Sequence, residues 1–352
     1  MAAPIVNILT RSDAILLCHP SMEDLAESIK ARCSQLAMDM ESRDDSSDKA
    51  YMRQISRGRQ NIELKTKAIK WEKFPDGWPN LFIDDVKNCY GRDVIFIGSF
   101  HSPEVVFEQL SILYAIPRYL ARSFTCILPY FPTGTMERVD TEGQIATAKT
   151  LATLLSAIPY TARGPAQLVI YDIHALQERF YFSDGVIPRL ESAIPLLLRE
   201  IQTLPDRENV CIAFPDDGAF KRFHTSFEGF DTITCVKIRE GKQRIVQVKD
   251  GNPRGKKVII VDDLIQTGGT LKNCAKALLD RGASAISAYV THAVFPNKSW
   301  ESFVDSQIRF QEFWITDSIP HAKEISQHPP FKLLSLCDAV SEMLFGFDLL
   351  QG

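Results

Sequence analysis

Short, continuously apolar runs rich in β-branched and aromatic residues recur along the chain and constrain its fold more than any other feature. Runs of this kind are typical of strands that are covered on both faces, as in a parallel sheet. Helical stretches lie between them. We predict strands over residues 14–18, 94–100, 124–130, 168–173, 210–214, 233–238, 258–264 and 285–291. We predict helices over residues 22–36, 103–120, 144–156, 191–201 and 270–281.

The alternation of strand and helix predicts an α/β protein with mainly parallel sheets and helices on both faces of each. A chain of 352 residues exceeds what one hydrophobic core usually serves, so we expect two such domains in tandem. The predicted boundary lies near residues 188–192, which gives domains over 1–190 and 191–352.

Two segments depart from the alternation. Residues 38–60 are polar and charged without a sustained apolar period, and we predict a mobile surface insertion there. Residues 331–350 are again apolar and partly helical. This last stretch of about 20 residues could pack on either domain, the first included.

The charge balance excludes one large class of partner. The net charge is −4, and a nucleic-acid-binding protein usually carries a strong basic bias. No apolar run approaches the ~20 residues that span a bilayer. We therefore expect neither a nucleic acid nor a membrane as partner, and we expect phosphate groups, if any, to be bound by local groups in a site.

The cysteines and the amino-terminal residues favour the cytoplasm. The eight cysteines form no C-x-x-C pair, and several lie inside apolar runs, which suits reduced, buried thiols better than disulfides or structural zinc. Residues 1–10 lack the basic region and apolar stretch of a secretory signal.

The sharpest functional signal follows the predicted strand 258–264. Its end carries two carboxylates, and a threonine- and glycine-rich turn then leads into a helix. Backbone amides at such a turn bind phosphate, and carboxylates accept hydrogen bonds from sugar hydroxyls or a metal-bound ligand. An ordinary helix cap would explain one aspartate but not this combination. The candidate residues are Asp262, Asp263, Gln266, Thr267, Gly268, Gly269 and Thr270.

Three other stretches carry polar groups at or beyond predicted strands. His174 and Asp216 each follow a buried run, and Lys237 and Arg239 alternate along a third. Taken singly, each has a structural explanation: a satisfied histidine, a turn aspartate or a solvated strand face. Because ligands bind outside the carboxyl ends of the strands in α/β sheets, we expect these groups to converge at such an edge.

These stretches resemble the ribose-phosphate pyrophosphokinase family. The strand-Asp-x-His-Ala segment, the Pro-Asp-x-Gly segment with its Lys-Arg pair, the Lys-x-Arg pair and the Asp-Asp loop occur in the family's order over nearly the whole chain. The plant-type class II members are most similar, because they share residues 73–77, 131–135, 174–180 and 313–318. No G-x-x-x-x-G-K-[ST] motif is present, so ATP would not be held by a P-loop.

The resemblance implies two phosphoribosyltransferase-like domains, a homo-oligomer, and a magnesium-dependent enzyme of nucleotide biosynthesis with ATP and ribose 5-phosphate as substrates. It places ATP between the domains and assigns ATP and magnesium to His174 and Asp216. It assigns the transition state to Lys237 and Arg239, and adenine to Asp76 from a neighbouring subunit. It further assigns the ribose hydroxyls to Asp262 and Asp263, and the 5-phosphate to Gln266 through Thr270.

Some positions differ from class I members of the family. Thr135 and Met136 replace an Arg-Gln pair that binds ATP, Trp78 replaces an acidic residue, and Gln266 replaces an aspartate. These differences resemble class II, whose members work without free phosphate and accept other nucleotides; Arg138 is our candidate for the missing cation. Two alternatives stay open: a silent regulatory homologue that assembles with an active synthetase, and a phosphoribosyltransferase.

Overall fold

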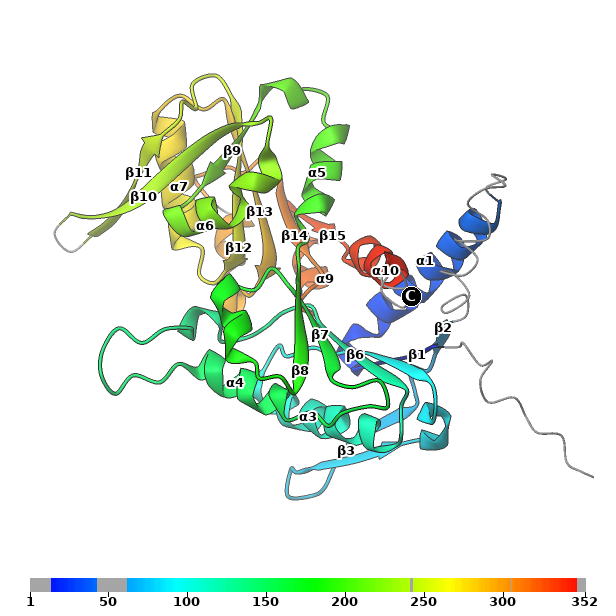
Figure 1. The fold of residues 1–352 in the computed structure, drawn as a ribbon. Helices are drawn as coiled ribbons and strands as arrows, with labels where there is room; N and C mark the ends of the chain where they lie inside the picture. The colour runs from blue at the N-terminus through cyan, green and yellow to red at the C-terminus, as the bar shows by residue number, and fades with distance from the viewer. Residues whose placement is uncertain (1–13, 43–61, 241–242, 305, 347–352) are drawn as a thin grey trace, which may run out of the picture. The chain divides into compact units, whose positions relative to one another are not determined.

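The computed structural model describes residues 14–42, 62–240, 243–304 and 306–346 (Figure 1). The chain divides into two compact units. The first contains the residues up to Glu191 together with those from Cys337 onward, and the second contains Ser192–Leu336. Each unit is built around its own sheet.

The sheet of the first unit has the order β2-β1-β5-β6-β7-β8, and all of its neighbouring strands run parallel. The central strands have buried residues at nearly every position, because helices cover both faces. A separate antiparallel hairpin consists of β3 and β4. The strand bounds are β1 (Ala14–Cys18), β2 (Ile62–Leu64), β3 (Ile69–Lys73), β4 (Pro79–Ile83), β5 (Asp93–Ile97), β6 (Ser123–Leu128), β7 (Ala166–Tyr171) and β8 (Val186–Glu191).

The helices of the first unit include one from the far end of the chain. Helix α10 packs against α1, and Arg32 Nε lies 2.8 Å from Asp338 Oδ1. Helix α1 continues through residues 38–42, so the prediction of an insertion beginning at 38 is wrong for those residues, and 43–60 lie outside the described chain. The helix bounds are α1 (Glu23–Ser42), α3 (Pro103–Arg118), α4 (Thr147–Ser156) and α10 (Cys337–Gly346).

The sheet of the second unit has the order β11-β10-β9-β12-β13-β14-β15. Its neighbouring strands are parallel except for the edge pair β10 and β11. The strand bounds are β9 (Val210–Phe214), β10 (Asp231–Glu240), β11 (Gln243–Asp250), β12 (Lys257–Ile265), β13 (Ala285–Ala293), β14 (Phe313–Thr316) and β15 (Phe331–Leu334). The helix bounds are α5 (Ile194–Thr203), α6 (Asp217–Phe223), α7 (Gly269–Asp280), α8 (Glu301–Val304) and α9 (Ala322–Ile325).

Strand β12 shows why a continuous apolar run is required in the middle of this sheet. Val258 and Ile260 belong to one buried cluster, and Ile259 and Val261 belong to another. Since successive side chains of a strand point to opposite faces, the strand fills two cores at once. An alternating polar pattern would leave one of these cores unfilled. No helix in the described parts of the chain is long and apolar enough to cross a membrane.

Candidate active site

The glycine-rich turn of the second unit joins the end of β12 to the start of α7. Gly268 has φ +80° and occupies the position just before the helix. A Cβ atom at Gly268 would lie 2.4 Å from ring atoms of Phe303, so glycine is required for both space and backbone conformation. Gln266, Thr267 and Gly269 are exposed. The first-turn amides of α7 have no acceptor within the helix, and they are therefore suited to bind an anion.

Two carboxylates precede this turn on β12. Asp263 is 5% exposed, and its backbone amide donates a 3.0 Å hydrogen bond to Asp262 Oδ1. Burial, followed by the neighbouring Asp263, raises the pKa of Asp262 well above its ordinary value, and Asp216 adds to the effect. Burial and the two acidic neighbours therefore disfavour the charged form of Asp262 in the free protein. A hydroxyl donor or a cation at this place would stabilise that charged form.

Asp216 lies at the end of the strand next to β12. It caps α6, and its Oδ1 accepts hydrogen bonds of 3.0 Å from the amides of both Gly218 and Ala219. The capping interaction fixes the orientation of the carboxylate. Because β9 and β12 are parallel neighbours, Asp216 reaches the same edge of the sheet as Asp262.

Lys237 and Arg239 lie on β10 beyond the point at which that strand stops pairing with β9. The parallel ladder ends where Thr234 pairs with Phe214, and β10 then continues antiparallel to β11. In that ladder Lys237 is paired with Val246, and Arg239 with Arg244. The backbone of both residues therefore extends past the edge of the sheet at which Asp216 lies.

In the first unit, His174 follows β7 and is exposed. A Cβ atom at Gly134 would lie 3.0 Å from His174 Cβ, so the turns that follow β6 and β7 are in close contact. Thr133 and Asp172, which flank this contact in the sequence, have left-handed backbones with φ of 66° and 37°. Such strained residues cluster at functional sites, because only tightly constrained surroundings maintain them.

Asp76 and Arg138 lie on other parts of the first unit. Asp76 is exposed in the turn of the β3–β4 hairpin, where its Oδ1 accepts a 3.2 Å bond from the amide of Trp78. The side chain of Arg138 is 76% exposed, and its Nε lies 3.6 Å from Glu137 and 3.9 Å from Asp140. Asp76 and Arg138 thus lie on separate turns, and their common role with His174 in ATP binding stays a prediction.

The described residues include no group of three or more His, Cys, Asp or Glu side chains that could hold a metal ion. The donor chemistry nevertheless fits magnesium, which prefers oxygen ligands, keeps several waters and often takes only one or two protein carboxylates. Asp216 supplies such a carboxylate in a fixed orientation. His174, a nitrogen donor in the other unit, is a weaker choice of direct ligand.

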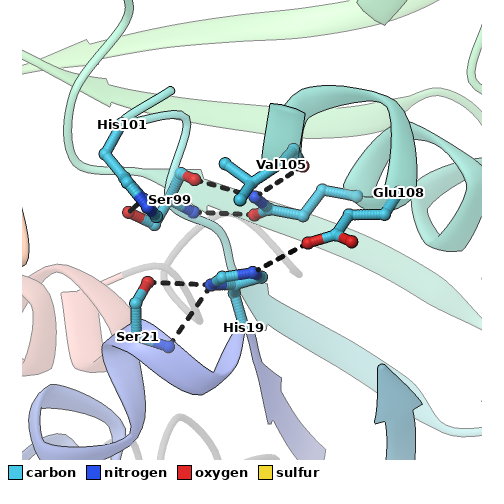
Figure 2. A network of polar contacts seen from close by, with 7 residues as sticks. His19, Ser21, Ser99, His101, Val105 and Glu108 are labelled. Atoms are coloured by element: carbon cyan, nitrogen blue, oxygen red, sulfur yellow. Dashed lines mark hydrogen bonds and ion pairs between the residues drawn. The ribbon is translucent and has the colours of Figure 1, made fainter. Parts of the chain in front are cut away.

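Sequence reasoning missed a partly buried polar cluster in the first unit, the His19 cluster, which consists of His19, Ser21, Ser99, His101 and Glu108 (Figure 2). His19 follows β1, and Ser99 follows its neighbour β5. His19 Nδ1 lies 2.8 Å from Ser21 Oγ and accepts from the Ser21 amide, so Nε2 carries the proton and donates to Glu108 Oε1 at 3.3 Å. Burial, followed by His101, lowers the pKa of His19 to about 4.

Comparison with known proteins identifies the class to which both halves belong. Residues 15–158 match the family model of the N-terminal domain of ribose phosphate pyrophosphokinase, and residues 196–318 match that of the phosphoribosyl transferase domain. A crystal structure of phosphoribosylpyrophosphate synthetase from Mycobacterium smegmatis superposes with a TM-score of 0.75. That match covers 97% of this chain and 100% of the other at 19% identity, and it shows the fold. The predicted fold class, two phosphoribosyltransferase-like domains with mainly parallel sheets, is confirmed.

Similarity to plant proteins is much higher. Ribose-phosphate pyrophosphokinase 4 of Oryza sativa subsp. japonica is 53% identical over 287 residues, which cover 80% of this chain and 88% of that protein. Ribose-phosphate pyrophosphokinase 3, mitochondrial, of Spinacia oleracea is 52% identical over 291 residues, which cover 81% of this chain and 72% of that protein. The chain belongs to the ribose-phosphate pyrophosphokinase family.

Proposed function

We propose that the protein is a ribose-phosphate diphosphokinase. It transfers the β,γ-diphosphate of ATP to the 1-hydroxyl of ribose 5-phosphate and releases 5-phosphoribosyl 1-diphosphate and AMP. The observation that carries this proposal is the turn between β12 and α7, with two carboxylates before a glycine whose conformation no other residue fits. The turn belongs to a chain that is 53% identical to a named pyrophosphokinase over 80% of its length.

The sugar phosphate binds at this turn. The amides of residues 267–270 and the hydroxyls of Thr267 and Thr270 donate to the 5-phosphate, and Gln266 adds a polar contact. Asp262 and Asp263 accept hydrogen bonds from the ribose hydroxyls. Binding is favourable partly because a hydroxyl donor stabilises the charged form of Asp262, which burial and its acidic neighbours disfavour in the free protein.

Lys237 and Arg239 act on the transferred group. Phosphoryl transfer depends mainly on positioning and on the neutralisation of charge, with little covalent work for the protein. Arginine offers a planar fork for two phosphate oxygens, whereas lysine is a mobile point charge, so the two are not interchangeable. Magnesium, when bound, would neutralise the charge of polyphosphate oxygens. Asp216 would hold the ion, together with His174.

The nucleotide is held by the first unit. His174 contacts the ATP phosphates. Arg138 supplies the cation of the Arg-Gln pair that Thr135 and Met136 replace. Asp76 contacts adenine from a neighbouring subunit. The exposed position of Asp76 in a hairpin turn supports a role toward a second copy of the chain. We therefore propose a homo-oligomer, a class II reaction that needs no free phosphate, and a relaxed preference among nucleotides.

A cytoplasmic location is part of the proposal. The eight cysteines are free thiols, and seven of them are buried, which suits a reducing compartment. Three of the relatives carry names that place them in chloroplasts or mitochondria. Cell fractionation with compartment markers tests the location, and recovery with an organelle marker would contradict it.

The decisive experiment measures AMP release by the purified protein with ATP, magnesium and ribose 5-phosphate, without added phosphate. AMP that appears only when the sugar phosphate is present supports diphosphoryl transfer, and activity without phosphate supports class II. ATP binding without AMP release would instead favour a regulatory homologue, which the substitutions at Thr135, Met136 and Gln266 keep open. Consumption of 5-phosphoribosyl 1-diphosphate with a base would favour a phosphoribosyltransferase.

A further inference from the structure

A strained segment follows β13 and packs against the phosphate-binding turn. Phe295, Asn297 and Lys298 all have left-handed backbones, with φ of 37°, 53° and 55°. Residues with this backbone conformation are strained, and they persist only where the surroundings impose it. The amides of Val294 and Phe295 donate to the carbonyl of Ile265, the residue just before the turn, at 3.1 and 3.4 Å. The strain therefore lies directly beside the proposed 5-phosphate site.

Side chains from residues 299–303, which we name the brace, hold the turn from one side. Ser299 Oγ donates a 3.1 Å hydrogen bond to the carbonyl of Gln266. The Phe303 ring lies against Gly268, where a Cβ atom would come within 2.4 Å of it. Both ends of the turn thus contact the same short piece of chain.

The brace is also fixed to the helix that follows the turn. Lys272 Nζ donates to the carbonyl and the hydroxyl of Ser302, each at 2.7 Å, and lies 4.3 Å from the Phe303 ring centroid. Ser302 Oγ in turn donates to the carbonyl of Ser299 at 2.7 Å. A continuous set of hydrogen bonds therefore runs from α7 through Ser302 and Ser299 to Gln266.

The bond from Ser299 determines the direction of an amide on the binding side. A trans peptide group is planar, and its carbonyl and N–H point in opposite directions. Because Ser299 holds the carbonyl of Gln266, the N–H of Thr267 must point away from the brace. Without that bond the peptide plane is free to rotate, and the Thr267 amide loses its fixed direction.

We propose that Ser299 is a positioning residue for ribose 5-phosphate: it holds the Gln266–Thr267 peptide so that the Thr267 amide faces the sugar phosphate. The inference rests on the proposed function and deepens it, because it assigns sugar-phosphate affinity to a residue that does not touch the substrate. Ser299 contacts the turn that binds ribose 5-phosphate, so its effect falls on this substrate and not on ATP.

The test compares Ser299→Ala with Ser284→Ala and Ser299→Thr. Ser284 Oγ donates to the carbonyl of Lys256 at 2.8 Å, so its replacement removes the same kind of bond at the amino end of β13. Calorimetric titration with ribose 5-phosphate gives the affinity independently of catalysis. Steady-state kinetics give KM for each substrate, and thermal unfolding reports the fold.

We expect Ser299→Ala to weaken ribose 5-phosphate binding about 5-fold, the size expected from one neutral hydrogen bond. The KM for ATP and the melting temperature should stay close to those of the wild type. Ser284→Ala should bind like the wild type, and Ser299→Thr should restore most of the affinity.

Three outcomes overturn the inference, and they can be distinguished from one another. If the wild type binds ribose 5-phosphate and Ser299→Ala binds it equally well, the inference fails while the proposed function stands. The same conclusion follows if Ser299→Ala raises KM for both substrates by the same factor. If the wild type itself binds no ribose 5-phosphate, the inference and the proposed function fail together.

Discussion

The carboxyl edges of the two sheets differ in whether their polar groups are already stabilised by the surrounding protein. In the second unit, burial and the nearby Asp263 and Asp216 raise the pKa of Asp262. In the first unit, His19 is neutral and bonded on both ring nitrogens, to Ser21 and Glu108. A carboxylate whose charged form is disfavoured gains from a ligand that donates a hydrogen bond or carries positive charge, whereas polar groups that are already bonded to each other stabilise the fold. This difference supports the proposal that the edge of the second sheet binds the substrates and that the His19 cluster is structural.

The largest difference between the two edges should appear in the turnover of variants that lack a cation on β10. We expect Lys237→Ala or Arg239→Ala to lower kcat by about 10³-fold, by analogy with the loss of a transition-state arginine. The melting temperature should change little. Lys257→Ala is the control. Lys257 is the first residue of β12, at the end of that strand away from the proposed site, and its Nζ lies 2.6 Å from Asp206 Oδ2. Full turnover in either β10 variant would refute the assigned role.

The next effect concerns the glycine pair of the turn. Gly268→Ala places a Cβ 2.4 Å from the Phe303 ring and keeps φ near +80°, so it should lower the free energy of unfolding by about 3 kcal/mol. Gly269→Ala meets nothing within 4 Å and should leave stability unchanged or slightly higher. Urea unfolding of both variants measures the difference. Equal stabilities would show that the turn tolerates a side chain at Gly268.

The His19 cluster should respond in stability and not in substrate affinity. His19→Ala removes a buried partner of Glu108 and should lower the free energy of unfolding by about 2 kcal/mol at pH 7.5. The KM for ribose 5-phosphate should stay unchanged. A large rise in this KM would show that the His19 cluster also contributes to substrate binding and would contradict the proposed difference between the two edges.

The pH dependence of this loss follows from the lowered pKa of His19. The neutral ring stabilises the fold fully above the ordinary histidine value of 6.5, and this contribution is lost as the pH falls through the folded value of about 4. The difference between wild type and His19→Ala should therefore shrink between pH 6.5 and 4. Denaturant titrations at several pH values measure it, with His101 and Glu108 as the neighbouring titratable groups.

The smallest effect should be a gain in stability, in contrast to the losses expected for Gly268→Ala and His19→Ala. Asp262→Asn removes a carboxylate whose charged form is disfavoured by burial and by Asp263, so it should stabilise the protein at neutral pH by about 1 kcal/mol. A raised pKa makes the wild type relatively more stable as the pH falls toward the ordinary aspartate value, so the gain should shrink on acidification. Ribose 5-phosphate binding should weaken at the same time. A destabilised variant at pH 7.5 would contradict the idea that the charged form of Asp262 is disfavoured in the folded protein.

The sequence predicted the central strands of both sheets but missed strands at or next to the edges. Strands β1 and β9 have the predicted bounds, and β12 and β13 exceed theirs by one or two residues. Strands β2, β14 and β15 are only 3, 4 and 4 residues long, too short for a periodic signal. Helix α5 begins at Ile194 instead of residue 191, with a proline in its first turn.

The sequence by itself determined the class of the fold, and it predicted the turn to which we assign phosphate binding. Continuous apolar runs require coverage on both faces, and the order Asp-Asp, glycine turn, helix is a local pattern. Only the tertiary structure decided that Ser299 and Phe303 hold that turn, that α10 joins the first unit, and that His19 meets Glu108. These contacts join residues 33 to more than 300 positions apart or depend on space beside a glycine, and the strand and helix patterns of a sequence carry no such distances.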